Sequence, residues 1–234
     1  PHLAKAANQV IPESGGFDPL EINELLVKWP SSGFFFAPTM IVRLLASGAI
    51  SEAARANLRT IIYGGGPMYT QDLHQALDVF GPRLIQIYGQ GEAPMTITYL
   101  SKSMHEDKTH PNFTKRMSSV GIPRTDVEVA VVKESGQLVA DNQPGEIIVR
   151  GDVVMKGYWE NPKSTAAALK DGWLYTGDVG VIDVDGFLTL KDRTKDMIIS
   201  GGSDIYPREV EEVLLQHDAV LEASVVGRFH PDWG

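Results

Sequence analysis

The chain lacks cysteine, long apolar runs and basic tracts. Without any Cys among its 234 residues, it can form no disulfide, no thiolate zinc site and no cysteine nucleophile. No apolar stretch reaches the roughly 18 residues needed to span a bilayer, and no basic-then-apolar leader opens the chain. We therefore expect no transmembrane segment and a soluble, cytoplasmic protein.

Sequence patterns for several common kinds of site and partner are missing as well. The 6 His residues show no spacing typical of a metal site. No Gly-x-Ser-x-Gly segment occurs, so an esterase has no support. The net charge is −9 and the chain has no Lys/Arg-rich stripe, which argues against nucleic acid as the main partner.

What is present is the composition of a globular protein. The chain is 43% hydrophobic, which is enough for a buried core, and its length fits one large domain or one domain plus part of another. The first residue is Pro1 rather than Met. We therefore expect the chain to be a piece of a longer protein.

The first hundred residues alternate between helical and strand patterns. Helices are predicted at "DPLEINELLVKW" with Asp18 as N-cap, at "TMIVRLLASG" with Thr39 as N-cap and Gly48 as stop, and at "MYTQDLHQALDVFG" with Thr70 as N-cap. Strands are predicted at "GFFFAP", "LRTIIY" and Leu84–Tyr88. This alternation favours an α/β fold with a mostly parallel sheet and flanking helices, in which ligands bind beyond the carboxyl ends of the strands.

The pattern changes after about residue 104. Residues 101–119 are polar without a clear period and predict a loop. A β-rich subdomain is then predicted over about 117–192, with strands at "DVEVAVV", "EIIVRG" and "VVMKGYW", a helix at "NPKSTAAALKDG" and a hairpin that turns at Asp185-Gly186. Residues 1–192 would thus belong to one large domain. Residues 193–234, with a strand, a Gly-Gly loop, a helix begun by Pro207 and a strand at "LEASVVGR", predict the beginning of a small α+β domain.

Two glycine-containing segments follow predicted strands. Gly64, Gly65 and Gly66 would let the backbone approach a flat or anionic ligand closely, although an ordinary strand-to-helix turn would look the same. In "YGQGEAP", Glu92 is an acid at a strand end, where one carboxylate and the phosphates of a ligand can hold magnesium. Tyr88 can stack on a base. A solvated acid and a core tyrosine remain the alternatives.

Two charged residues in the second half of the chain are further candidates. Asp178 in "YTGDVG" follows a turn and can accept both hydroxyls of a ribose, or else bond to its own backbone as turn Asp residues do. Arg193 lies in a charged segment and suits a phosphate or sugar, although a solvated interdomain linker has the same composition.

In this order, these motifs resemble those of the adenylate-forming enzymes, which include AMP-dependent acyl-CoA synthetases, coumarate-CoA ligase, firefly luciferase and the adenylation domains of peptide synthetases. The resemblance is carried by "GEIIVRGDVVMKGYWENPKSTAAALKDGWLYTGDVG" and "DRTKDMIISGGSDIYPREVEEVL", and it extends from about Phe17 to the end of the chain. It implies that the chain holds the second half of the family's large domain and the start of its C-terminal domain.

The resemblance also implies a role for each matching residue. Tyr88 would stack on adenine, Asp178 would bind the ribose with help from Arg193, and Glu92 would be the catalytic residue that ligates Mg²⁺. Gly64–Gly66 would lay backbone along adenine, and Gly89 and Gly91 would also belong to the cofactor-binding residues. Lys195 matches the hinge, and Gly201 and Gly202 match the loop that moves toward the thioester site. Tyr63 and Met95 would line the acyl pocket. Gly91 stands where the family usually has Thr.

The implied activity has two steps. ATP and a carboxylic acid would give an acyl-adenylate, and the thiol of CoA would then take the acyl group after the C-terminal domain rotates. The family's phosphate loop finds no match before Phe17 and its terminal Lys would lie beyond Gly234, so this chain alone would be inactive. Two alternatives stay open: an adenylation domain that loads a carrier protein, and a non-catalytic nucleotide-binding or oligomerisation module. The acid and the oligomeric state are not determined.

Overall fold

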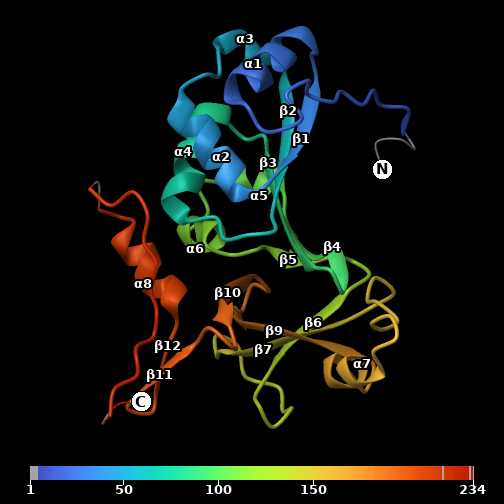
Figure 1. Cartoon of the computed structure of the whole chain (residues 1–234), viewed down its shortest axis with the longest axis vertical. Coiled ribbons are helices and arrows are strands. Elements are labelled where there is room, and N and C mark those ends of the chain that lie inside the picture. Colours follow the sequence, from blue (N-terminus) through green and yellow to red (C-terminus); the bar gives the residue numbers. More distant parts are fainter. Residues whose placement is uncertain (1–4, 218, 232, 234) are drawn as a thin grey trace.

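The fold consists of two β-sheets and a small C-terminal unit (Figure 1). The structure is a computed structural model and describes residues 5–217, 219–231 and 233. The first sheet and its helices form one body, the second sheet lies below it in Figure 1, and the C-terminal helix runs along the side of both. There are two hydrophobic cores: one lies between the first sheet and its helices, and the other is shared by the second sheet with β3 and β4 of the first. Within the described residues, no helix has the length and apolar character to cross a membrane.

The first sheet is mixed rather than mostly parallel. Its strands lie in the order β1 (Ser32–Phe36), β2 (Leu58–Tyr63), β3 (Leu84–Gln90), β4 (Ala93–Leu100) and β5 (Ile122–Pro123). The pairs β1–β2 and β2–β3 are parallel, whereas β3–β4 and β4–β5 are antiparallel. The chain reverses directly after β3 because Gly91 and Glu92 form a tight turn between the paired residues Gln90 and Ala93. The parallel pairing of β2 with β3 places the end of β3 beside the loop that follows β2.

Four helices accompany the parallel part of this sheet: α1 (Pro19–Lys28), α2 (Pro38–Ser47), α3 (Glu52–Asn57) and α4 (Thr70–Phe80). The side chain of Asp18 caps α1 and Gly48 ends α2 in a left-handed conformation, as predicted. The predicted caps Thr39 and Thr70 are wrong, since α2 begins at Pro38 and α4 already includes Thr70. In both helices the side chain of the N-cap residue makes no capping hydrogen bond to the first turn.

The prediction of a loop over residues 101–119 is wrong in part. Two short helices lie there, α5 (Lys102–Glu106) and α6 (Phe113–Met117). Each has only 5 residues, which is too short to display a helical period in the sequence. The Ser101 hydroxyl accepts a hydrogen bond from the Met104 amide and thus caps α5. Burial of His105 and Met117 fixes the two helices against the core.

The second sheet is antiparallel, with the strand order β10 (Leu188–Arg193), β9 (Trp173–Ile182), β7 (Gly145–Arg150) and β6 (Glu128–Val132). The short β8 (Leu169–Lys170) pairs with β9 and follows α7 (Pro162–Ala168). The β9–β10 hairpin turns at Asp185-Gly186 as predicted. The strand predicted at residues 153–159 is wrong, because this segment forms a loop whose amides bond to Glu92 and to α7.

The C-terminal unit contains the hairpin β11 (Ile198–Ser200) and β12 (Ser203–Ile205), followed by α8 (Pro207–Leu214). The helix begins at Pro207 as predicted. The strand predicted at residues 221–228 is wrong, since these described residues form an extended segment without strand pairing. Alternating apolar residues form a strand only when their backbone pairs with another strand, and β11 and β12 pair only with each other among the described residues.

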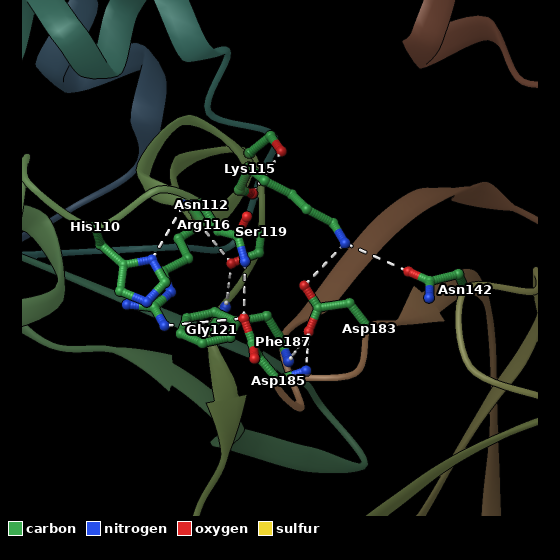
Figure 2. A network of polar contacts seen from close by, with 11 residues as sticks. His110, Asn112, Lys115, Arg116, Ser119, Gly121, Asn142, Asp183, Asp185 and Phe187 are labelled. Atoms are coloured by element: carbon green, nitrogen blue, oxygen red, sulfur yellow. Dashed lines mark hydrogen bonds and ion pairs between the residues drawn. The ribbon is translucent and has the colours of Figure 1, made fainter.

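A polar network joins α6 to the turn of the β9–β10 hairpin (Figure 2). The buried Asp183 carboxylate accepts hydrogen bonds from the amides of Asp185 and Phe187, at 3.0 and 2.9 Å, and pairs with Lys115 Nζ at 3.1 Å. Arg116 lies over the Phe187 ring at 4.7 Å. Burial alone would raise the pKa of Asp183, but the Phe187 amide and Lys115 outweigh it, so the pKa lies below its usual 3.8.

We predict that Asp183→Ala destabilises the protein at pH 7 by about 1–3 kcal/mol, because two amides in the turn lose their acceptor. Asp185→Ala is the matched control, since its carboxylate is 38% exposed and is expected to contribute under about 1 kcal/mol. Urea unfolding measures both changes. The lowered pKa means that the charge-dependent stabilisation is present above pH 3.8 and is lost as the pH falls through the folded-state value. Equal effects of the two substitutions would contradict the network.

Candidate active site

A cavity of about 940 Å³ lies where the two sheets and the C-terminal unit meet. Gly65 and Gly66, which follow β2, and Tyr88–Glu92 at the end of β3 line one side of it. Asp178 on β9 and the segment from Arg193 to Ile198 line the other side. The cavity therefore sits beyond the carboxyl ends of the parallel strands β2 and β3, where α/β sheets place their ligands.

The Asp178 carboxylate is the centre of the polar contacts in this cavity. Tyr88 donates its hydroxyl to Asp178 Oδ2 at 2.6 Å, and Gln90 Nε2 donates to the same oxygen at 2.7 Å. Arg193 Nε lies 3.4 Å from Asp178 Oδ1. Asp178 and Arg193 are paired across the β9–β10 hairpin, so strand register explains why the two meet. Donors from both sheets thus hold one nearly buried carboxylate.

The ionisation state of Tyr88 follows from these contacts. The side chain is only 7% exposed, and burial together with the negative charge of Asp178 raises the pKa of Tyr88 far above neutrality. Tyr88 is therefore a permanent hydrogen-bond donor to Asp178. Tyr88 is not simply a core residue, because its hydroxyl donates a hydrogen bond to a carboxylate that lines the cavity.

Gln90 is a site residue that the sequence interpretation missed. Besides its bond to Asp178, its amide nitrogen donates to the Thr176 carbonyl at 2.9 Å and so ties β3 to β9. Its position between the two glycines of "YGQGE" was the available signal. The motif interpretation assigned functions to its neighbours and left Gln90 out.

Two glycines of the motif differ in their surroundings. A Cβ on Gly89 would lie 2.3 Å from the Met95 nitrogen and 2.7 Å from the Ala93 oxygen, so only glycine fits at this irregular position of β3, where β4 approaches closely. A Cβ on Gly91 would meet no heavy atom within 4 Å. Gly91 lines the cavity, and its missing side chain leaves open space there. The structure can accommodate the Thr that the family usually has.

Glu92 lines the cavity and is half-buried. Its Oε1 accepts a hydrogen bond from the Tyr158 hydroxyl at 2.6 Å, and its carbonyl accepts one from the Met155 amide at 2.7 Å. The bond to Glu92 raises the pKa of Tyr158, so the phenol stays protonated at neutral pH. Among the described residues, no cluster of three or more acidic, His or Cys side chains could hold a metal ion. A cation here would rest on Glu92 and on ligand oxygens, which suits Mg²⁺.

Several predicted site residues do not line the cavity: Tyr63, Gly64, Met95, Gly201 and Gly202. Gly64 packs on β3, where a Cβ would lie 2.3 Å from the Ile87 oxygen. Gly201 and Gly202 form the turn between β11 and β12. The predicted roles of these residues have no support from the cavity geometry and stay predictions.

The two residues predicted for the acyl pocket lie in different surroundings. Met95 is 52% exposed in the β3–β4 hairpin. Tyr63 is fully buried, and its hydroxyl contacts Gln86 Oε1 at 3.3 Å and His105 Nε2 at 3.1 Å. Burial lowers the pKa of His105 to about 4, so the ring is neutral at physiological pH. Gln86 lines the cavity, and Tyr63 contacts the side chain of Gln86 without lining the cavity itself.

Lys195 lines the cavity in the segment between β10 and β11. The C-terminal unit beyond it is fastened to the first sheet by α8. Tyr69 donates its hydroxyl to Glu211 Oε2 at 2.9 Å, and the Thr70 amide donates to Glu212 Oε1 at 2.8 Å. These contacts join residues that are 142 positions apart, and nothing in the sequence pattern could have identified them.

Comparison with known proteins identifies the family to which this fold belongs. Residues 1–159 match the model of the family described as "AMP-binding enzyme". The chain belongs to the AMP-binding enzyme family. This match covers the glycine loop and the "YGQGEAP" motif, so the sequence resemblance to adenylate-forming enzymes is confirmed at the family level.

Similar curated proteins are acid–CoA ligases. The chain is 39% identical over 93% of its length to the medium/long-chain-fatty-acid–CoA ligase FadD8 of Mycobacterium tuberculosis, of which it covers 37%. It is 36% identical over its whole length to a feruloyl-CoA synthase of an Amycolatopsis species, of which it covers 45%. The chain therefore spans less than half the length of the curated relatives that it matches.

Solved structures confirm the fold. The amide bond synthetase McbA of Marinactinospora thermotolerans superposes with a TM-score of 0.84 at 35% identity, over 94% of this chain and 44% of that one. The o-succinylbenzoate CoA synthetase of Bacillus subtilis, in complex with its acyl-adenylate intermediate, superposes with a TM-score of 0.73 at 36% identity, over 87% and 39%. The α/β fold with an additional antiparallel sheet is thus the fold of this family's large domain.

We predict that Gly89→Ala destabilises the protein by about 2–3 kcal/mol, because its Cβ would collide with backbone atoms that cannot move independently. Gly91→Thr is the matched control in the same hairpin and is expected to change stability by less than about 0.5 kcal/mol, since the side chain enters open space. Urea unfolding of the two variants gives the comparison. A Gly89→Ala variant as stable as the wild type would show that the β3–β4 hairpin relaxes freely.

Proposed function

We propose that this chain is the nucleotide-binding part of an AMP-forming acid–thiol ligase. The observation that carries the proposal is the Asp178 carboxylate, held by Tyr88, Gln90 and Arg193 at the edge of a cavity that Gly65 and Gly66 also line. A fixed carboxylate beside exposed backbone suits a nucleoside, whose ribose offers two hydroxyl donors and whose base is flat.

Five residues that line the cavity each have a role in the proposed binding of the nucleotide. Asp178 accepts the ribose hydroxyls, and Arg193, which pairs with this carboxylate, adds a donor to the same ligand. Tyr88 orients Asp178 through its hydroxyl and offers its ring to the adenine. Gly65 and Gly66 expose backbone along the base. The donors that fix Asp178 before the ligand arrives reduce the ordering cost of binding.

Glu92 is the residue that would hold Mg²⁺. Its carboxylate lines the cavity and is fixed by Tyr158, which satisfies the requirement for one protein carboxylate beside nucleotide phosphates. When bound, Mg²⁺ supplies positive charge to phosphate oxygens as negative charge develops on them. The open space at Gly91 leaves the adjacent position without the hydroxyl donor that relatives with Thr have.

The proposed reaction joins a carboxylic acid to a thiol. A carboxylate oxygen attacks the α-phosphorus of ATP, the bond to the β-phosphate oxygen breaks, and pyrophosphate leaves. The thiol of CoA then attacks the acyl carbon and AMP leaves. Positioning and electrostatic stabilisation supply most of the catalysis for such steps. Lys195 would be the hinge between the two steps, and the Gly201–Gly202 turn would move with the C-terminal unit.

We base the proposed acid and the proposed acyl acceptor on the names of the relatives. FadD8 is named for medium and long fatty acids and the Amycolatopsis enzyme for ferulic acid, so we propose a fatty or aryl acid. CoA is the proposed acceptor, because the curated relatives that we compared are named as CoA ligases or synthases. A carrier protein and a module without catalysis remain alternatives. An assay that offers both acceptors separates CoA from a carrier protein: the product is either the thioester of CoA or an acylated carrier protein.

We predict that this chain alone catalyses no ATP–pyrophosphate exchange with a panel of fatty and aryl acids. The chain covers 37% of FadD8 and 45% of the feruloyl-CoA synthase, and the family resemblance implies a phosphate loop and a terminal Lys that these residues do not contain. The exchange of labelled pyrophosphate into ATP is the measurement. Exchange at the rate of a relative of full length would contradict the prediction and would place all essential groups within these 234 residues.

We predict that Asp178→Ala weakens AMP and ATP binding to this chain at least about tenfold, because each charge-assisted hydrogen bond to a ribose hydroxyl contributes about 1.5–3 kcal/mol. Asp152→Ala removes an exposed carboxylate that does not line the cavity and serves as the matched control. Isothermal titration with each nucleotide measures both affinities. Unchanged affinity in Asp178→Ala would refute the nucleotide site, whatever the catalytic activity of the longer protein.

A further inference from the structure

The loop that follows β7 holds Glu92 in two places. The Met155 amide donates to the Glu92 carbonyl at 2.7 Å, and the Tyr158 hydroxyl donates to Glu92 Oε1 at 2.6 Å. One segment thus fixes both the backbone and the side chain of Glu92. This segment follows a strand of the second sheet, and Tyr158 lies 66 positions after Glu92 in the chain. A surface acid that served only solubility would have no need of two such contacts.

The segment that carries Tyr158 is itself clamped to α7. The Tyr158 amide donates to Thr165 Oγ1 at 2.9 Å, and Thr165 Oγ1 donates to the Asn161 carbonyl at 2.9 Å. Gly157 has a φ of +150°, and a Cβ there would lie 2.9 Å from Thr165 Cγ2. The backbone before Tyr158 can pack against α7 only because residue 157 is glycine. The contacts with α7 therefore hold the Tyr158 phenol in position to donate to Glu92.

One bond to one oxygen leaves the other oxygen available. An ionised carboxylate offers about four lone-pair positions, of which the phenol uses one, on Oε1. The bond removes the rotational freedom of the carboxylate and aims Oε2 in a fixed direction. Partners of a metal-binding carboxylate commonly act in this way, by orienting the ligand before the ion arrives.

We propose that Tyr158 is a positioning residue, which orients the Glu92 carboxylate for the divalent cation that accompanies the nucleotide. This inference rests on the proposed function, because it takes Glu92 as the residue that holds the cation. Tyr158 does not line the cavity, so we expect it to make no direct contact with a nucleotide bound there. It acts through Glu92, so its loss should alter cation binding and leave metal-free nucleotide binding intact.

The test uses Mn²⁺ as the probe in place of Mg²⁺, in the 234-residue chain with saturating ATP. Electron paramagnetic resonance measures free Mn²⁺ and gives its affinity. Tyr158→Phe is expected to weaken Mn²⁺ binding about tenfold, as is usual when a partner of a metal ligand is removed. ATP binding in the presence of EDTA should stay unchanged. Tyr175→Phe, which removes a hydroxyl on β9 away from the cavity, is the matched control and should bind Mn²⁺ as the wild type does.

Glu92→Gln separates the two levels of the proposal. If Glu92→Gln weakens Mn²⁺ binding and Tyr158→Phe does not, the positioning role is overturned while the role of Glu92 stands. If Glu92→Gln binds Mn²⁺ as the wild type does, the metal assignment of the proposed function fails and the positioning role fails with it. The double variant should bind no more weakly than Glu92→Gln alone, since Tyr158 acts only through that carboxylate. Additive losses would overturn the positioning role.

A merely structural role of Tyr158 has a different signature. It would lower the midpoint of urea unfolding in Tyr158→Phe and weaken ATP binding with and without EDTA to the same degree. That result overturns the proposal. In the longer protein, if this chain is part of one, the expected result is a raised Mg²⁺ concentration for half-maximal rate, with kcat at saturating Mg²⁺ close to that of the wild type.

Discussion

The structure depends on one buried carboxylate that both sheets must satisfy. Asp178 belongs to the second sheet, yet two of its three donors, Tyr88 and Gln90, belong to β3 of the first sheet. A nearly buried charge without such donors would cost several kcal/mol. The sheets are therefore held in the one arrangement that brings these donors together, and the cavity between them is a consequence of the same arrangement.

Further contacts join the two sheets and the elements around them, at the cavity and away from it. Glu92 from the first sheet is oriented by Tyr158 from the second, and the hairpin turn of the second sheet is held by Lys115 from α6. The C-terminal unit adds a third contact through Glu211 and Glu212 on α8. A ligand bound in the cavity would touch all three parts, so binding and the relative position of the parts are coupled.

Local patterns identified most of the fold. Asp18, Gly48 and the Asp185-Gly186 turn act through residues within a few positions, and these predictions are confirmed. The errors lie where local preference competes with distant partners. Residues 153–159 have the composition of a strand but bond to Glu92 and α7, and two helices of five residues in 101–119 are too short to give a period.

The amino-acid sequence was enough to recognise the family, because ordered motifs such as "YGQGEAP", which lies in the part that matches the family, are specific even when each residue alone is not. The residues of the site remain predictions from the same motifs. Only the tertiary structure decided which of these residues face one another. Gly64 and Tyr63 lie outside the cavity lining, and Gln90 and Tyr158 emerge as partners of Asp178 and Glu92. The reason is physical: a motif fixes order along one strand, whereas a hydrogen bond between sheets depends on register and packing that no single segment contains.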